Sequence, residues 1–373
     1  MPAAISVRVL DSIIRIEFDE TLEKAVGEEI ADQWSAMTVP DDSAADITVR
    51  LSVGSGPAPS DGTTIAYVAP SQEEAAQHLV TQLTLTGIEA LFGHAVLLHS
   101  SAVALEDGRV IGFIGPSGRG KTTVARTLGT GLGYVTDETL AIRADGSVIP
   151  YPKPLSLVRG PGPKQAFGPL ALGLQPHPEV PLTIGALVLL DRRAEPTDAR
   201  VERIGLAEAI GLIAPHTSAL GILDRPITEL IEVVRRAGGL RRAVYSEAAD
   251  LAALLPLILS HSVPVEDEIE PLAGVADVPA RGASDVQSSG RYRRAPSREA
   301  VRIGDDIVVF VAPTVFVLTG IGPLLWRCAD DVTAEELTAL TVRTLPPPDG
   351  VDPADAVRRA LDELVDVGLL AVS

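Results

Sequence analysis

A glycine-rich segment carries the clearest chemical signal in the chain. Residues 115–122 have the sequence Gly-Pro-Ser-Gly-Arg-Gly-Lys-Thr, a complete G-x-x-x-x-G-K-[ST] pattern. A strand-like run, 110–114, precedes it, and 123–128 has the composition of a helix start. Glycines let the backbone N–H groups converge on a polyphosphate, and the following helix directs its positive end at the same anion. The pattern predicts a nucleotide triphosphate site; the alternative is a chance match in a glycine-rich turn.

The residues of this segment would divide the work of holding a nucleotide. The ammonium of Lys121 would reach the β and γ phosphates, and the Thr122 hydroxyl would bind Mg²⁺. ATP or GTP, with Mg²⁺, are therefore the expected cofactors. The predicted nucleotide-binding residues are Gly115, Ser117, Gly118, Gly120, Lys121, Thr122 and Thr123.

Two acidic residues follow the next strand-like run, 134–136. We expect that run beside the loop strand in a parallel sheet, where sites collect at the carboxyl ends of strands. Asp137 is the candidate to accept the proton of an acceptor hydroxyl or to hold Mg²⁺ through water. Glu138, with Thr122, is the candidate metal ligand. Two acids at a strand end also form ordinary polar turns, so both assignments depend on the glycine-rich segment.

Other polar residues are weaker candidates. His99 follows the strand-like run 96–98 and is a possible catalytic group, although a lone histidine at a strand end is more often structural. Lys153 and Arg159 lie in loops where a cation could meet a phosphate, but loop cations are usually solvated. The other histidines, His216 among them, show no metal-like spacing. Motifs of hydrolase triads and zinc sites are absent from the sequence.

Composition narrows the class of protein. The chain has 373 residues and a formal net charge of −19, which argues against nucleic-acid binding because phosphate backbones are repelled. The single cysteine, Cys328, excludes an internal disulfide. The N-terminal sequence lacks a signal-peptide pattern, and no apolar run reaches the length of a membrane span. We expect a cytoplasmic protein that does not enter a membrane.

The pattern along the chain predicts four parts: an α+β unit (1–92), a P-loop α/β domain (93–263), a flexible linker (264–298) and a compact C-terminal domain (299–373). The fold class is α/β. A long proline-rich loop is expected over 160–181 and a hairpin around 144–146. Strands are expected at 4–18, 46–53, 63–68, 96–98, 101–105, 184–190, 369–372 and, as a pair, within 301–318. Helices are expected at 71–91, with Ser71 as its cap, and at 206–213, 227–236, 247–259, 322–329, 333–345 and 353–367.

Three segments in order resemble the catalytic domain of HPr kinase/phosphorylase and its kinase-like relatives: 98–104, 115–123 and 134–138. A hairpin and the proline-bearing run 149–155 extend the resemblance over roughly 95–260. It implies that Lys121 and Thr122 contact phosphate and metal, that Asp137 accepts the proton of a serine hydroxyl, and that His99 is an active-site histidine. The family usually has Asp where this chain has Glu138, and its later Glu and Arg signature has no match near 160.

The C-terminal segment resembles PqqD-like peptide-binding domains (RiPP recognition elements) through 308–313, 324–326, 333–337, 360–364 and 368–370. The resemblance implies a winged-helix-like fold that binds the leader region of a ribosomally made precursor peptide as an added strand. The alternative is a winged-helix DNA binder. Residues 299–373 contain 13 acidic and 5 basic residues, a poor surface for phosphate contacts.

Together these features predict a kinase-like protein that binds a precursor leader peptide and phosphorylates a Ser or Thr hydroxyl. The alternative is a catalytically inactive adaptor that delivers the precursor to partner modifying enzymes. A GTPase-type switch is less favoured because no base-recognition motif is visible. The sequence leaves open whether the chain forms a homo-oligomer.

Overall fold

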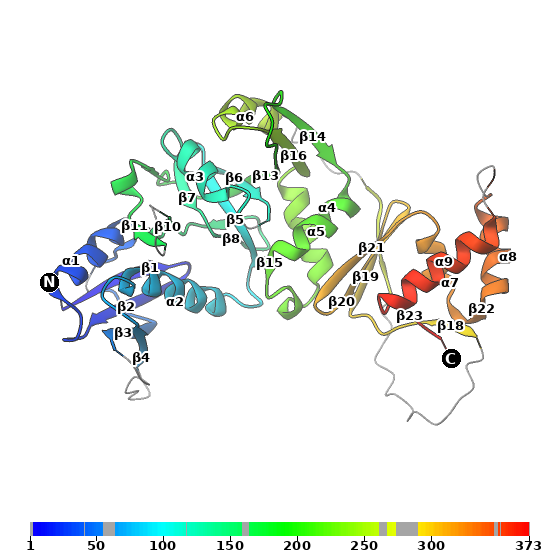
Figure 1. Cartoon of the computed structure of the whole chain (residues 1–373), viewed down its shortest axis with the longest axis horizontal. Coiled ribbons are helices and arrows are strands. Elements are labelled where there is room, and N and C mark those ends of the chain that lie inside the picture. The colour runs from blue at the N-terminus through cyan, green and yellow to red at the C-terminus, as the bar shows by residue number, and fades with distance from the viewer. Residues whose placement is uncertain are drawn as a thin grey trace. The chain divides into compact units, whose positions relative to one another are not determined.

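The computed structural model describes residues 3–40, 42–54, 64–116, 118–158, 164–260, 267–273, 290–346, 350 and 352–372. They form a mixed α/β protein with several sheets (Figure 1). The chain divides into two compact units. The first contains Met1–Ile204, His216–Leu223 and Glu232–Pro264, and the second contains Gly205–Pro215, Asp224–Ile231 and Val265–Ser373. The first unit therefore combines the two parts that the sequence predicted as 1–92 and 93–263.

The N-terminal part of the first unit is a four-stranded sheet with two helices, α1 (Lys24–Gln33) and α2 (Ala75–Ala90). The predicted strands are present as β1 (Ala4–Val9), β2 (Ser12–Phe18), β3 (Ile47–Val53) and β4 (Thr64–Ala69). Helix α2 begins four residues later than predicted, although the Ser71 hydroxyl still accepts a hydrogen bond from the Glu74 N–H at 3.3 Å. Helix α1 was not predicted.

The central sheet of the first unit corrects the predicted order of its strands. Residues Val96–Ala104 form one strand, β5, where two were expected, so His99 lies within a strand and not at its end. Strand β5 lies between β6 (Arg109–Ile114) and β7 (Gly133–Thr136) and is antiparallel to both. The cause is the tight turn at 106–108, which folds β6 back onto β5 and leaves the other edge of β5 for β7. The strands that follow are β13 (Thr183–Arg192), β14 (Arg200–Ile204), β15 (Thr217–Ser218) and β16 (Leu240–Tyr245).

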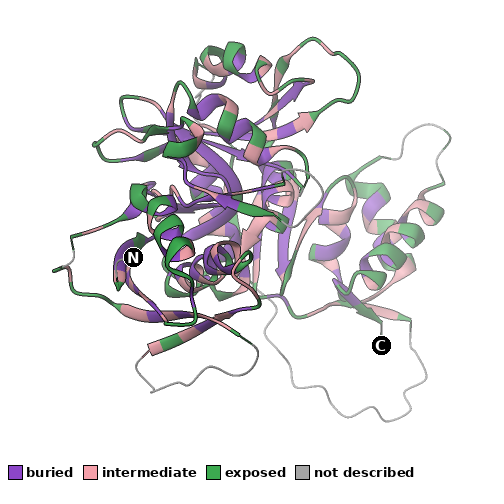
Figure 2. Ribbon diagram, turned by 60° about the vertical axis from the view of Figure 1, so that its left-hand side comes forward, coloured by how far each residue is buried: buried purple, intermediate pink, exposed green. Residues whose placement is uncertain are grey.

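Two hydrophobic cores hold the first unit together, and Figure 2 shows the buried strands around them. Helices α3 (Lys121–Gly129) and α6 (Asp250–Ser260) contribute Val124, Leu128, Leu254 and Ile258 to one core on the central sheet. The other core joins the N-terminal part to the central sheet. It includes Leu79 and Leu83 of α2 together with Leu97, Ala141, Ile149 and Tyr151. The N-terminal part is thus continuous with the central sheet through shared apolar burial.

The segment after β7 contains more structure than predicted. The hairpin is present as β8 (Thr139–Ile142) and β9 (Val148–Ile149). The expected proline-rich loop is wrong for its described portion: β10 (Leu155–Leu157) pairs with β11 (Gln165–Phe167), and β12 (Gln175–Pro176) adds to the edge of the central sheet. Arg159 and residues 160–163 lie outside the described residues.

The second unit contains a four-stranded antiparallel sheet: β17 (Ile269–Leu272), β19 (Glu299–Ile303), β20 (Asp306–Val311) and β21 (Thr314–Leu318). Residues 301–318 thus belong to three strands, where two were expected. Helix α4 (Leu206–Ile213) packs against β20 and β21. The Glu299 carboxylate accepts hydrogen bonds from the N–H groups of Ile227, at 2.7 Å, and Thr228, at 3.2 Å, in the first turn of α5 (Pro226–Arg236).

A three-stranded sheet and three helices complete the second unit. The strands are β18 (Arg291–Arg294), β22 (Asp330–Thr333) and β23 (Leu370–Val372), and the helices are α7 (Gly322–Cys328), α8 (Ala334–Thr344) and α9 (Pro353–Asp366). The predicted capping box of α8 is present between Thr333 and Glu336.

The predicted linker is wrong where the structure describes it, because β17 and β18 lie inside 264–298. Strand β17 pairs with β19, and β18 is the middle strand of its sheet, where the guanidinium of Arg294 lies 5.3 Å from the centre of the Trp326 ring. The rest of the predicted linker, 264–266 and 274–289, lies outside the described residues.

Candidate functional site

The glycine-rich loop, residues 115–120, connects β6 to α3 in the first unit. Gly118 and Gly120 have φ angles of 78° and 92°. A side chain there would meet no atom within 4 Å, so the conformation of the backbone requires glycine, and not lack of space. Lys121 and Thr122 open α3, as the sequence pattern predicts. Ser117, a predicted nucleotide-binding residue, lies outside the described residues.

Lys121 lies against the loop that precedes it. Its ammonium donates hydrogen bonds to the carbonyl oxygens of Gly115, at 2.7 Å, and Pro116, at 3.3 Å. Lys121 is 7% exposed, and this burial lowers the pKa of its ammonium, although the Glu138 carboxylate opposes the shift. An anion with several oxygens would be a stronger partner for this cation than two neutral carbonyl groups.

Asp137 connects the loop side of the site to β7. The Thr122 hydroxyl donates to Asp137 Oδ2 at 3.2 Å, and the buried Tyr134 hydroxyl donates to Oδ1 at 3.2 Å. Asp137 is 6% exposed. Although β5 separates β7 from β6, the carboxyl end of β7 therefore still lies at the start of α3. The predicted proximity of Asp137 to Thr122 is confirmed, even though the predicted strand order was wrong.

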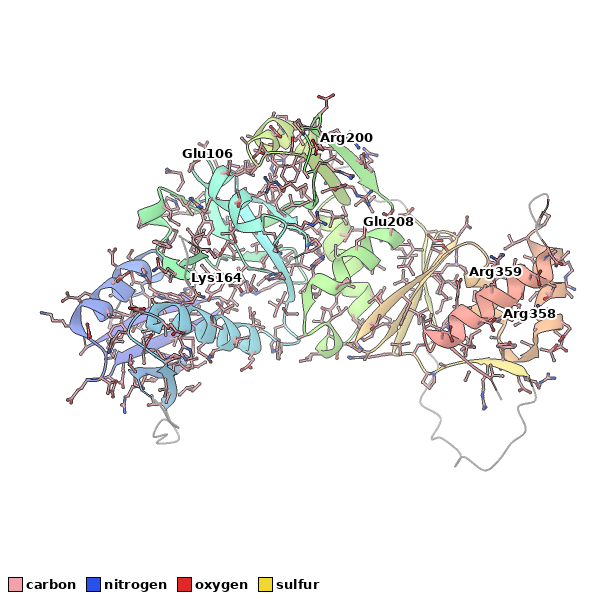
Figure 3. The ribbon with its side chains drawn as sticks, in the orientation of Figure 1. Glu106, Lys164, Arg200, Glu208, Arg358 and Arg359 are labelled. Atoms are coloured by element: carbon pink, nitrogen blue, oxygen red, sulfur yellow. The ribbon has the colours of Figure 1, made fainter. Side chains whose placement is uncertain are left out.

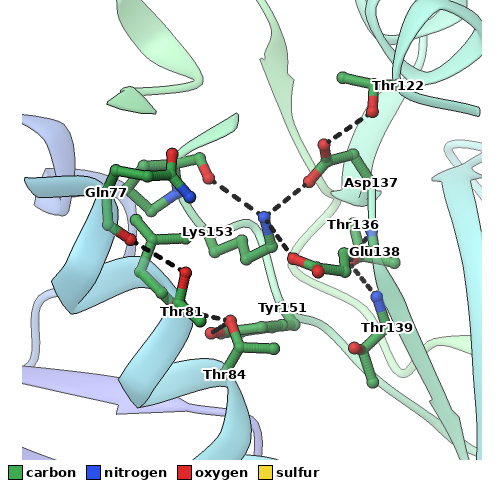
Figure 4. A network of polar contacts seen from close by, with 12 residues as sticks. Gln77, Thr81, Thr84, Thr122, Thr136, Asp137, Glu138, Thr139, Tyr151 and Lys153 are labelled. Carbon is green, nitrogen blue, oxygen red and sulfur yellow. Dashed lines mark hydrogen bonds and ion pairs between the residues drawn. The ribbon is translucent and has the colours of Figure 1, made fainter. Parts of the chain in front are cut away.

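A buried lysine that the sequence gave only an ambiguous role lies at the centre of the acidic pair. Lys153 is 1% exposed, and its Nζ lies 3.1 Å from Asp137 Oδ1 and 2.9 Å from Glu138 Oε2 (Figure 4). Its third contact is the carbonyl oxygen of Pro154, at 3.2 Å. Burial alone would lower the pKa of Lys153, but the two carboxylates raise it above its ordinary value. Lys153 is therefore a fixed positive charge, and not a solvated loop cation.

Glu138 is the more accessible member of the pair. Its burial would raise the pKa of the carboxyl group, but the Lys153 ammonium more than offsets this and lowers the pKa. Glu138 was predicted to bind a metal, and in this structure its partner is an ammonium group. Among the described residues, no group of three or more His, Cys, Asp or Glu side chains could hold a metal ion. A metal here would therefore need oxygen ligands from a bound phosphate or from water.

The N-terminal helix α2 is connected to the Lys153 segment. The Tyr151 hydroxyl lies 2.8 Å from Thr84 Oγ1, and Thr84 in turn donates to the Val80 carbonyl oxygen at 2.7 Å (Figure 4). Tyr151 is fully buried in the core that α2 shares with the central sheet. Sequence reasoning saw no chemistry in residues 1–92, and the conserved spacing of a motif could not reveal this contact because the partners are 67 residues apart.

His99 lies on β5 at the same site. Desolvation, and then the Lys121 ammonium, lower the pKa of its imidazole more than Glu138 and Asp137 raise it. His216, to which the sequence gave no role, precedes β15, whose Thr217 is paired with Leu98 of β5. Continuing that antiparallel register brings position 216 opposite position 99. Desolvation and Lys121 lower the pKa of His216 as well, so both histidines are neutral at pH 7.

The loop, the acids and α2 enclose one cavity of about 540 Å³, a size typical of small-molecule sites. Most of the predicted site residues contribute to its wall, and Gly115 contacts the site through Lys121. The lining residues that the sequence did not assign come from α2, from the Lys153 segment and from Lys164, which is labelled in Figure 3. The predicted residues in the wall are His99, Gly118, Gly120, Lys121, Thr122, Thr123, Asp137 and Glu138.

Comparison with known proteins adds no identity to this geometry. No protein-family model matches the chain, and no curated protein matches it either. Within the described residues, no helix is both long enough and apolar enough to cross a membrane. The function of the cavity is therefore inferred from its own residues.

Proposed function

We propose that this chain is a kinase-like protein that transfers the γ-phosphoryl group of Mg²⁺-ATP or Mg²⁺-GTP to a Ser or Thr hydroxyl of a ribosomally made precursor peptide. The observation that carries the proposal is the single cavity shared by Lys121 and Asp137. Phosphoryl transfer needs positioned charge more than covalent chemistry. This cavity supplies cations for the phosphates and a carboxylate for the acceptor.

The loop side of the cavity suits the nucleotide. The N–H groups of the glycine-rich loop and the start of α3 favour an anion, and Lys121 can exchange its two carbonyl contacts for phosphate oxygens. Thr122 and Asp137 offer the oxygen ligands that Mg²⁺ prefers, directly or through water. When bound, Mg²⁺ would neutralise charge on the phosphates. The Thr122–Asp137 contact of 3.2 Å is compatible with two groups that serve the same ion.

The acid side suits the acceptor. As the acceptor oxygen bonds to the γ phosphorus, the bond to the nucleoside diphosphate breaks and Asp137 takes the hydroxyl proton. Lys153 and the Tyr134 hydroxyl hold the Asp137 carboxylate in place. His99, neutral and on the wall of the same cavity, is a second group that can hold a proton.

The second unit would hold the precursor peptide. Strand β21 is at the end of its sheet, and its outer edge pairs with no strand among the described residues. An extended leader peptide can add to such an edge through main-chain hydrogen bonds, with side chains in apolar pockets. The neighbouring core, which includes Leu325, Trp326 and Leu361, supports a winged-helix-like domain of the PqqD type.

Replacement of the loop cation tests the nucleotide site. We expect Lys121→Ala to reduce phosphoryl transfer to a precursor peptide by at least 1000-fold, because the transition-state charge on the phosphates loses its closest ammonium. The same variant should bind the leader peptide with unchanged affinity, measured by isothermal titration calorimetry. Transfer that survives at the rate of the unaltered chain would refute the nucleotide site.

One observation favours a second function, that of a non-catalytic adaptor. Lys153 engages both Asp137 and Glu138, and an ion-paired carboxylate is a weaker proton acceptor than a free one. In that case the chain would bind nucleotide and leader peptide and deliver the precursor to partner modifying enzymes. Measurable binding of both ligands without transfer of radiolabelled phosphate would support the adaptor over the kinase.

A further inference from the structure

A second cavity continues the candidate site along helix α2. It has a volume of about 230 Å³ and shares Gln77, Thr81 and Lys164 with the larger cavity. Its other lining residues are Pro70, Glu74 and His78. Because three residues line both cavities, the two adjoin and form one groove, which begins at the acids and ends near the start of α2.

The groove follows one face of the helix. Glu74, Gln77, His78 and Thr81 are three or four residues apart, so their side chains lie in a row over successive turns. Lys164, between β10 and β11, contributes to both cavities as well. The row is polar, with a carboxylate, an amide, an imidazole and a hydroxyl in sequence. Such a row matches the alternating donors and acceptors of an extended peptide backbone better than an apolar ligand.

Gln77 carries a polar atom without a partner. Its Oε1 is buried and accepts no hydrogen bond from any described residue. A buried acceptor left unpaired is costly, and native structures hold few of them. A main-chain N–H of a bound peptide would satisfy this atom.

The groove lies on the side of the site where an acceptor is needed. In an in-line transfer, the acceptor approaches the phosphorus opposite the leaving nucleotide. Figure 4 shows Gln77 and Thr81 of α2 on one side of Lys153, and Asp137 and Thr122 on the other. The loop wall thus suits the donor, and the α2 wall is left for the acceptor.

We propose that this groove selects the acceptor: it binds an extended peptide segment beside the target Ser or Thr hydroxyl, with a basic side chain directed to Glu74. The inference rests on the kinase function proposed above. Glu74 lines the end of the groove away from the acids and is an exposed carboxylate. The formal charge of −19 adds a long-range attraction for basic peptides. Residues 1–92 therefore belong to substrate recognition.

An oriented peptide library tests the charge preference. The full chain would be incubated with radiolabelled ATP, Mg²⁺ and Ser-centred peptides in which each flanking position is fixed in turn as Lys, Arg, Asp, Glu or Ala. We expect at least a fivefold preference for Lys or Arg at one position, and Glu74→Lys should reverse it in favour of Asp or Glu. Glu73→Lys is the matched control, because Glu73 is the exposed neighbour outside both cavities; it should retain the preference.

The outcomes separate this inference from the proposed function. Transfer with the same charge preference in the unaltered chain and in Glu74→Lys, or an equal change in Glu73→Lys, would overturn the acceptor groove and leave the kinase intact. No transfer by the unaltered chain to any library peptide would overturn both. On the preferred peptide, Gln77→Leu should raise KM about tenfold, the effect of one lost hydrogen bond; an unchanged KM would contradict the groove. Thermal melting verifies that each variant folds.

Discussion

The two units both bury carboxylates, and they compensate the charge in different ways. In the first unit, Asp137 and Glu138 share the Lys153 ammonium, with separations of 3.1 and 2.9 Å. In the second unit, Glu299 accepts hydrogen bonds from main-chain N–H groups at the start of α5, and from the Thr228 hydroxyl at 2.5 Å. A helix start fixes a carboxylate for structure. A mobile-proton partner such as an ammonium, in a cavity, keeps two carboxylates charged beside a ligand.

The largest effect is expected from removal of the shared ammonium. Lys153→Met would leave two buried or half-buried carboxylates without their counter-ion, and a broken buried pair typically costs about 3–5 kcal/mol of unfolding free energy. Urea unfolding at pH 7 measures this loss. Lys164→Met, which removes an exposed lysine from the same cavity, is the control. Equal stability of Lys153→Met and the unaltered chain would show that the triad is not a coupled unit.

The pH dependence of this loss follows from the shifts. The pKa of Glu138 is below its ordinary 4.5, so its contribution is present above pH 4.5 and disappears as the pH falls through the lowered value. The pKa of Lys153 is above its ordinary 10.5, so its contribution is complete below pH 10.5 and disappears as the pH rises further. The stability difference between Lys153→Met and the unaltered chain should therefore be flat from pH 6 to 9 and shrink below pH 4.5. A difference that grows in acid would contradict the ion-pair account.

A smaller effect is expected from the cap in the second unit. Glu299→Ala removes the acceptor of two N–H groups, and the loss of such a helix cap costs about 1–2 kcal/mol. Glu299→Gln keeps a side-chain oxygen and should lose less. Glu232→Ala, at an exposed position of the same helix, controls for helix propensity. If thermal unfolding gave Glu299→Ala and Glu232→Ala equal midpoints, the cap would have no energetic role.

The smallest effect is expected from the contact between α2 and the Lys153 segment. Tyr151→Phe removes one hydroxyl, whose partner is Thr84 Oγ1 at 2.8 Å, and a hydrogen bond of this kind contributes about 1 kcal/mol. Because Thr84 still donates to the Val80 carbonyl, the hydroxyl left behind keeps a partner. Hydrogen exchange of α2 should accelerate several-fold in Tyr151→Phe while α3 is unaffected. Equal acceleration in both helices would mean that the contact is not local.

Local patterns in the sequence predicted the parts of the site that are continuous in the chain. The glycine-rich loop, the start of α3 at Lys121 and the acid after β7 follow from neighbouring residues alone. The turn at 106–108 was also predicted, but its consequence was not: β5 occupies the position beside β6 where β7 was expected. Which edge a strand pairs with is decided by the whole sheet, and a short pattern does not contain that information.

Residues whose role depends on distant packing escaped sequence reasoning. Lys153 stands among prolines, a context typical of a solvated loop, and only the pairing with Asp137 and the packing of α2 explain its 1% exposure. Strands β17 and β18 have the composition of a linker and gain their structure from β19 and from β22 and β23. Gln77 and Thr81 look like ordinary polar positions on a surface helix until the opposite wall of the groove is known.

The apolar core that α2 shares with the central sheet has a practical consequence. A polypeptide that starts at residue 93 would carry the glycine-rich loop and both acids, yet it would expose Leu97, Ala141 and Ile149 to water. It would also open the Lys153 triad to solvent, where screening weakens every charge interaction in it. The autonomous catalytic module of this chain therefore starts at β1, and its boundary cannot be drawn at the glycine-rich loop's own sheet.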